Sequence, residues 1–129
     1  MTKVTDELRQ YIATIERISR VTYSYSDIEQ QLIDLLRFLE SNMNWRADLE
    51  PVLMEIVGTS PDGVVQILEF TMHTLRWDGV HRALENLRDT TPNWNEKRTA
   101  ERILEAWEDD WEDADLYDYY RTPDESASE

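Results

Sequence analysis

The amino-acid sequence predicts a small all-α domain, and three observations lead to this fold class. Apolar residues recur at intervals of three and four along most of the chain, as they do on the buried face of an amphipathic helix. The chain holds only three glycines and four prolines, and Pro51 and Pro61 stand at expected helix starts. Its 129 residues are the length of one domain, so a second core is not required.

Three helical patterns occupy the first half of the chain. The first predicts a helix over about residues 5–21, with Thr5 as its cap. Ser26 opens a second helix as the first residue of an S-x-x-E capping box. A third helix is predicted to begin near Pro51, because the missing N–H of proline needs no acceptor in a first turn, and to end at Gly58.

Three further patterns fill the second half. Ser60-Pro61 opens a helix over about residues 61–76, and Asp78 caps a fifth helix. Asn95 is the expected cap of a sixth helix, whose apolar spacing continues to Trp111 without a clear end. The short turns indicate a compact bundle of about six short antiparallel helices. A stack of HEAT-like helical hairpins is an alternative that no sequence repeat decides.

Negative charge is concentrated toward the C-terminus. The formal net charge is −15, and residues 105–129 hold 11 Asp and Glu against one Arg. A surface of this sign repels nucleic acid and anionic lipid, so we expect a basic protein partner, no direct nucleic acid binding and no membrane association. The composition divides the chain into a helical domain, residues 1–112, and an acidic, aromatic C-terminal segment, residues 113–129. We expect the domain to fold without that segment.

The residue types present exclude several classes of protein. Without cysteine the chain has no disulfide, thiolate metal site or cysteine nucleophile, which is typical of a cytoplasmic protein. No stretch approaches the ~20 uncharged residues of a membrane span, and the first residues lack the apolar region of a signal peptide. A cytoplasmic location is therefore expected.

Metal and catalytic sites are not expected either. An EF-hand loop starting at Asp113 would need glycine at its sixth position, where Asp118 stands. Neither His73 nor His81 has a glutamate three residues before it, as a di-iron helix requires. The two histidines could approach across a helix corner, but no serine-acid or glycine-rich signature accompanies them. We therefore expect no cofactor and no enzymatic activity.

Acidic and aromatic residues are interleaved near the end of the chain. Glu105, Glu108, Asp109 and Glu112 are spaced i, i+3, i+4 and i+7, which predicts four carboxylates on one face of the last helix. Their repulsion near a helix C-terminus is unfavourable, so local stability does not explain them. Aromatic side chains anchor interfaces, and surrounding carboxylates steer a cationic partner. The predicted partner-binding residues are Glu108, Asp109, Glu112, Asp113, Asp115, Tyr117, Asp118, Tyr119 and Tyr120.

Two other readings of these residues stay open. The carboxylates could form a solvated tail that only aids solubility, and the tyrosines could fold back over the end of the bundle, where Trp107 and Trp111 are expected to pack.

Two short motifs carry a resemblance. Asp118-Tyr119-Tyr120 has Pro123 nearby, and Ser60-Pro61-Asp62-Gly63-Val64-Val65 opens a helix. Together they resemble motifs of bacterial toxin-immunity proteins, among them the small helical inhibitors of nuclease colicins, although the two motifs stand here in the reverse order. The resemblance implies an acidic surface that blocks the active site or substrate groove of a basic toxin, with Tyr119 and Tyr120 as anchors.

Three functional hypotheses follow from the sequence. The first is a non-enzymatic, immunity- or antitoxin-like inhibitor that neutralises a basic toxin or nuclease by protein-protein binding. The second is a helical adaptor or regulatory scaffold. The third is a DNA-mimicking inhibitor of a nucleic-acid-binding protein, which shares the acidic surface of the first.

Overall fold

Six α-helices build the fold over the residues that the computed structural model describes, which are 3–21, 25–58 and 63–120. These residues contain no strand, so the predicted all-α class is confirmed. The helices are α1 (Lys3–Ser19), α2 (Tyr25–Ser41), α3 (Arg46–Ile56), α4 (Val64–Leu75), α5 (Asp78–Thr90) and α6 (Trp94–Leu104). Short 3₁₀ turns follow α2 as η1 (Met43–Trp45) and α6 as η2 (Glu105–Trp107) and η3 (Glu112–Leu116).

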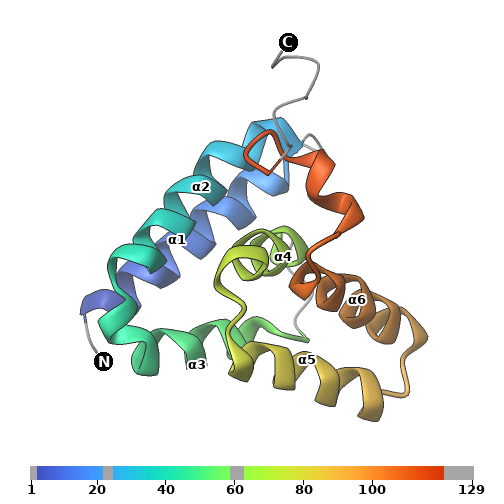
Figure 1. The fold of residues 1–129 in the computed structure, drawn as a ribbon. Coiled ribbons are helices and arrows are strands. Elements are labelled where there is room, and N and C mark those ends of the chain that lie inside the picture. The colour runs from blue at the N-terminus through green and yellow to red at the C-terminus, as the bar shows by residue number, and fades with distance from the viewer. Residues whose placement is uncertain (1–2, 22–24, 59–62, 121–129) are drawn as a thin grey trace.

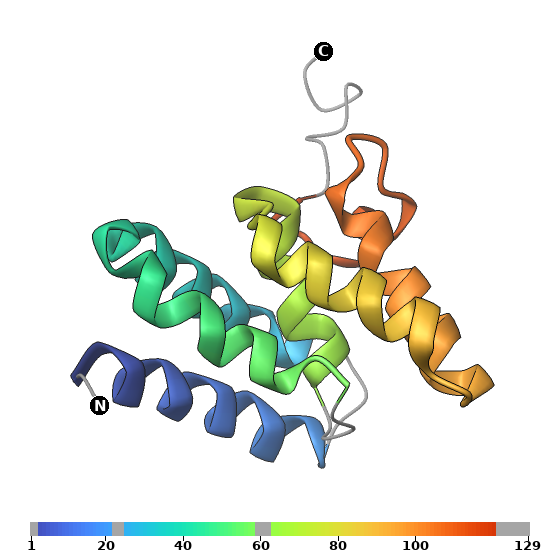
Figure 2. The same ribbon diagram turned by 90° about the horizontal axis from the view of Figure 1, so that it is seen from below.

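Two antiparallel helix pairs flank a central helix. α1 and α2 lie side by side, α5 and α6 form the second pair, and α4 lies between the pairs (Figure 1). α3 packs against both α1 and α5, so it bridges the two pairs, as the view from below shows (Figure 2). This arrangement is a compact bundle of short helices, as the sequence predicts.

The central helix α4 is buried on almost every side. Residues 67–72 are buried without interruption, which is more than one full helical turn and leaves no solvent-facing stripe there. α2, α6 and η2 cover it. Within the described ranges, neither α4 nor any other helix has the combined length and apolarity needed to reach across a bilayer.

Several helix starts differ from the sequence predictions. α3 begins at Arg46, so Pro51 lies in its interior and not in its first turn. The cost is limited because Pro51 and Ala47, whose carbonyl lacks its usual donor, are both solvent-exposed. α6 is capped by Asn93 and not Asn95: the Asn93 side chain accepts from the backbone N–H groups of residues 95 and 96, at 2.9 and 3.1 Å. The expected caps at residues 26 and 60 lie outside the described side chains.

A carboxylate from another helix caps α5. Asp78 is the first residue of α5 and its side chain does not cap the helix. Instead, Glu50 of α3 accepts hydrogen bonds from the backbone N–H groups of Gly79 and Val80, at 2.6 and 3.2 Å. Arg46 holds the same carboxylate at 3.1 Å. A negative charge at a helix N-terminus is favourable, so this contact ties α3 to α5.

Glycine is required at residue 79 by this cap. A Cβ added there would lie 2.5 Å from Glu50 Oε2 and 2.9 Å from Glu50 Cδ. Alanine is normally the better helix residue, by up to ~1 kcal/mol. In the wild-type protein we expect this gain to be cancelled, because Gly79→Ala displaces the Glu50 cap, whose loss typically costs about 1 kcal/mol. In a Glu50→Ala background the cap is already absent and only the flexible Met54 side chain, whose Sδ lies 3.2 Å from the added Cβ, has to shift, so the same substitution should stabilise the protein.

Urea unfolding of the four proteins of this double-mutant cycle measures the difference between the two backgrounds. An equal stabilisation by Gly79→Ala in both backgrounds would contradict the proposed role of Glu50.

Candidate functional site

Residues 105–120 form a chain of short turns that follows α6 (Figure 1). Hydrogen bonds from an N–H to the carbonyl three residues earlier recur at Glu108, Trp111, Ala114, Tyr117 and Tyr120. α6 itself ends at Leu104, and the backbone at Glu108 is extended. The prediction of four carboxylates on one face of a longer helix is therefore wrong.

From Trp111 to Tyr120, packed side chains recur at every third residue and the acidic side chains stand between them. In a 3₁₀ arrangement, residues three apart share one side of the chain. Trp111 and Tyr117 are buried at this spacing, and Ala114 and Tyr120 between and after them pack against the core. An α-helix would place the same residues on diverging faces. In the turns, Trp111, Tyr117 and Tyr120 all contact aromatic side chains of α4. Repulsion between the adjacent carboxylates would destabilise an α-helix that continued through this stretch. The turns are stabilised instead by the packing of these aromatic side chains.

Phe70 of α4 is the aromatic centre on which this segment docks. Its ring centroid lies 5.0 Å from that of Tyr117, 5.5 Å from Tyr119 and 4.9 Å from Tyr120. One turn further along α4, His73 lies 4.8 Å from the rings of both Trp111 and Tyr120. Aromatic pairs at these separations contribute about 0.5–1.5 kcal/mol each beyond the area that they bury.

Hydrogen bonds hold the same segment at three further points. The backbone N–H of Tyr119 donates to Glu29 Oε2 on α2 at 2.6 Å. The Tyr120 hydroxyl donates to the carbonyl of Phe70, and burial raises the pKa of Tyr120 above its ordinary value. His73 Nδ1 lies 2.7 Å from the carbonyl oxygen of Ala106. Side chains from both α2 and α4 therefore fix the path of the segment.

A buried carboxylate lies beneath the segment. Glu69 has no solvent exposure, and its Oε2 accepts from the Tyr117 hydroxyl at 2.9 Å and lies 3.3 Å from Arg102 Nη2. Its other oxygen has no hydrogen-bond partner among the described residues. Desolvation raises the pKa of Glu69 to about 7, although Arg102 and Tyr117 both act to lower it. Arg102 also lies 3.6 Å from Asp113, so it links the buried carboxylate to the acidic segment.

The predicted site residues separate into two groups. Tyr117 is buried and Tyr120 is half-buried against the core, so neither is the exposed interface anchor that the sequence predicts. Tyr119 keeps 43% of its surface exposed. The predicted carboxylates point outward, except that Asp113 is half-buried beside Arg102, and Arg76 pairs with Asp109 at 3.0 Å. The exposed carboxylates of the segment are Glu105, Glu108, Asp109, Asp110, Glu112, Asp115 and Asp118.

Sequence reasoning missed two parts of this surface. Leu116 is 44% exposed among the carboxylates, and Glu29 contributes from a distant helix. An apolar residue outside the three-residue period of buried positions is the signal that could have identified Leu116. No local pattern in the sequence pairs Glu29 with Tyr119.

The packed domain extends past the expected boundary between residues 112 and 113. That boundary falls inside η3, and Tyr117 beyond it belongs to the core. Residues 113–120 therefore pack as part of the helical domain and are not a detached solvated tail. Pro123, Ser60, Pro61 and Asp62 of the motifs quoted above lie outside the described residues.

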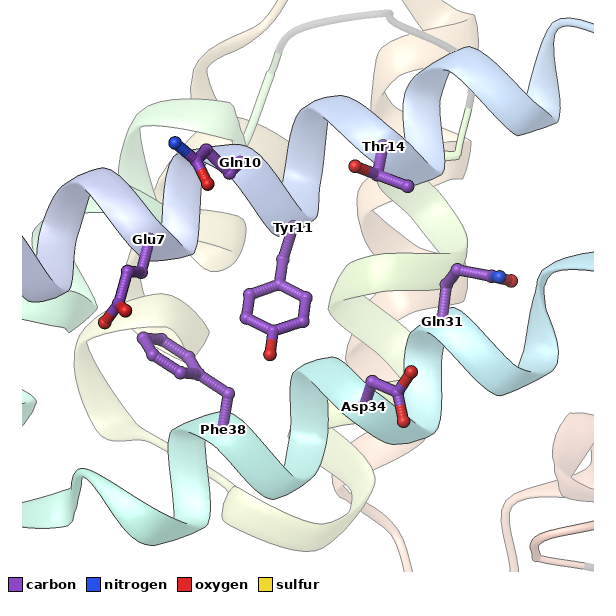
Figure 3. Close-up of a pocket in the computed structure, with 7 residues that line it drawn as sticks. All are labelled: Glu7, Gln10, Tyr11, Thr14, Gln31, Asp34 and Phe38. Atoms are coloured by element: carbon purple, nitrogen blue, oxygen red, sulfur yellow. The ribbon is translucent and has the colours of Figure 1, made fainter.

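A surface cavity of about 340 Å³ lies between α1 and α2, on elements other than the acidic segment (Figure 3). Tyr11 and Phe38 line it together with Glu7 and Asp34, and the centroids of the two rings lie 5.1 Å apart. This ring contact joins the two helices, so we assign it to packing.

The two histidines serve separate contacts. His81 lies 5.0 Å from the ring of Trp107 and 3.3 Å from Glu85, whereas His73 contacts the C-terminal segment. Across the described ranges, no group of three or more His, Asp or Glu side chains is placed to hold a metal ion. The residues that the structure does bring together are the aromatic and acidic ones of the C-terminal segment.

We expect removal of residues 113–129 to destabilise the fold, contrary to the expectation from sequence. The truncation removes the buried Tyr117, and loss of a large buried side chain alone costs about 3–5 kcal/mol. Chemical denaturation followed by circular dichroism measures the loss. A chain ending at Tyr120 is the control because it keeps every contact described above. Equal stability of the two truncated chains would show that the docked turns do not contribute to the fold.

We also expect a pH dependence that originates at Glu69. A pKa raised from 4.5 to about 7 means that the folded protein favours the protonated carboxyl, so this contribution to stability is complete below pH 4.5 and is lost as pH rises through 7. At ~1.4 kcal/mol per pKa unit the total loss is about 3 kcal/mol. Glu69→Gln retains an acceptor for Tyr117 without the charge, so its stability should lack this component.

The difference in unfolding free energy between wild type and Glu69→Gln, measured from pH 5 to pH 8, isolates the contribution of Glu69. A difference that does not change with pH would contradict it.

Comparison with known proteins gives no match to a family model, a curated protein or a solved structure. The most pronounced chemical feature of the described residues is the set of exposed carboxylates on a backbone fixed by buried aromatic side chains.

Proposed function

We propose that this protein acts by binding a basic protein, and not by catalysis, through the acidic surface formed by the exposed side chains of residues 105–119. The observation that carries the proposal is the charge of this stretch. Residues 105–120 contain eight carboxylates and no Lys or Arg, and seven of the carboxylates are exposed. Arg76 pairs with Asp109, and Arg102 lies near Asp113.

The way in which these charges are held supports a binding role. Like charges at this density repel one another, and a flexible segment would spread them apart. Here Trp111, Tyr117 and Tyr120 dock on α4 and fix the backbone that carries them. A surface that is already ordered loses little conformational entropy on association, which favours affinity for a partner of opposite charge.

The expected partner is a toxin or nuclease with a cationic surface, and the protein would be its immunity- or antitoxin-like inhibitor. Enzymes that act on nucleic acid present basic grooves to the phosphate backbone, and a fixed row of carboxylates can occupy such a groove. The resemblance of Asp118-Tyr119-Tyr120 to a motif of toxin-immunity proteins is in keeping with this proposal. The lack of cysteine is in keeping with action in the cytoplasm.

Charge reversal tests the acidic surface. We expect replacement of Glu108, Asp110 and Glu112 by lysine to slow association with the partner by about tenfold or more, because these charges steer the encounter, and to weaken its salt dependence. The partner would be recovered from an extract of the source organism with the wild-type protein, identified, purified and measured by surface plasmon resonance. Co-expression of the wild-type protein should suppress the toxicity of the partner.

A variant with Asp6, Asp48 and Asp89 replaced by lysine is the matched control, because it changes the net charge equally at exposed sites on other helices. If both variants lose the same amount of binding, net charge alone explains the effect, and the proposal of a specific acidic surface is contradicted. A recovered partner without toxicity would favour an adaptor over an inhibitor.

A further inference from the structure

A second cavity adjoins the acidic surface. It has a volume of about 390 Å³, lies between α2 and residues 118–119, and is lined by Glu29, Gln30, Ile33, Asp118 and Tyr119. Four kinds of side chain therefore meet there: two carboxylates, a carboxamide, an apolar side chain that packs against the core and an aromatic ring.

The carboxylate of Glu29 is fixed in place. Only 7% of Glu29 is exposed, and its Oε2 accepts the backbone N–H of Tyr119 at 2.6 Å. A carboxylate can accept about four hydrogen bonds, so this one bond leaves capacity for further donors from a ligand. Because the bond uses the backbone of Tyr119, it holds the wall of the cavity without occupying the tyrosine side chain.

The ring of Tyr119 is exposed and also held. It is 43% exposed, and it packs 5.5 Å from Phe70 and 5.0 Å from Tyr120. Ile33 lies on the same cavity and is partly buried against the core. The cavity thus offers apolar contact for the stem of a side chain, together with negative charge and an aromatic ring for its head group.

We propose that this cavity is the arginine subsite of the acidic surface, in which Glu29 and Asp118 hold the guanidinium group of a basic protein partner. The inference rests on the proposed function and names the side chain that the partner contributes. Arginine fits better than lysine because its planar group forms bidentate hydrogen bonds with carboxylates and stacks on aromatic rings. Its methylene stem would contact Ile33.

An NMR titration of the full chain with N-acetyl-arginine amide tests the subsite without a known partner. We expect saturable chemical-shift changes concentrated at Glu29, Ile33 and Tyr119, and weaker binding of N-acetyl-lysine amide. Changes spread over residues 105–115 without saturation at the cavity would overturn the proposal. Equal affinity for the lysine compound would overturn the assignment to arginine.

Three substitutions separate the roles of the cavity walls. Glu29→Gln keeps an acceptor for the Tyr119 N–H but removes the charge, and it should weaken arginine binding about tenfold or more, as expected for loss of a hydrogen bond to a buried charged group. Tyr119→Ala should weaken binding, whereas Tyr119→Phe should retain it because the ring remains. Glu55→Gln on α3 is the charge-matched control and should leave the affinity unchanged.

A negative result in this experiment can be distinguished from a negative result in the test of the proposed function. If the cavity does not bind arginine, the charge reversal at Glu108, Asp110 and Glu112 should still slow association with the partner, because those residues do not line the cavity. If the charge reversal has no effect on association, the titration with N-acetyl-arginine amide still reports whether the cavity binds arginine, because it does not use the partner. Unchanged arginine binding in both Glu29→Gln and Tyr119→Ala would overturn the subsite even if a basic partner is found.

Discussion

Burial of α4 on nearly all sides is the constraint on which the rest of the structure depends. A twelve-residue helix that hides six consecutive residues needs neighbours in every direction. The two helix pairs cover part of it, and the turns after α6 cover another part through Phe70 and His73. Residues 105–120 are therefore held in place because α4 requires a cover, and their exposed carboxylates occupy the outer side of that cover.

Glu69 places a carboxylate that needs hydrogen-bond donors in this apolar centre. A carboxylate without solvent exposure needs donors, and Tyr117 and Arg102 supply them from the covering segment and from α6. One of its oxygens stays without a partner among the described residues, so the burial is only partly compensated. The same arginine reaches Asp113, and the ionisation state of a core residue is thus linked to the base of the acidic surface.

Sequence periodicity predicted the helices because most of them bury one face. It failed where tertiary contact decides the outcome. α4 has no single buried stripe, so Ile67 and Phe70 could not be distinguished from surface positions by spacing. The stretch after Leu104 satisfies helical and 3₁₀ spacing alike, and only docking on Phe70 selects the turns and buries Tyr117. For the candidate site, the sequence indicated the charge and Tyr119 correctly as surface features, but not the contribution of Glu29.

The bond between Glu29 and the backbone of Tyr119 joins residues 90 positions apart. Loop-closure entropy disfavours so distant a contact until the intervening helices are in place. During synthesis the carboxylates of residues 105–118 emerge from the ribosome after α1 to α6 and acquire their fixed spacing only once residues 119 and 120 are free to dock. A nascent chain would consequently lack the ordered acidic surface until residues 119 and 120 have docked.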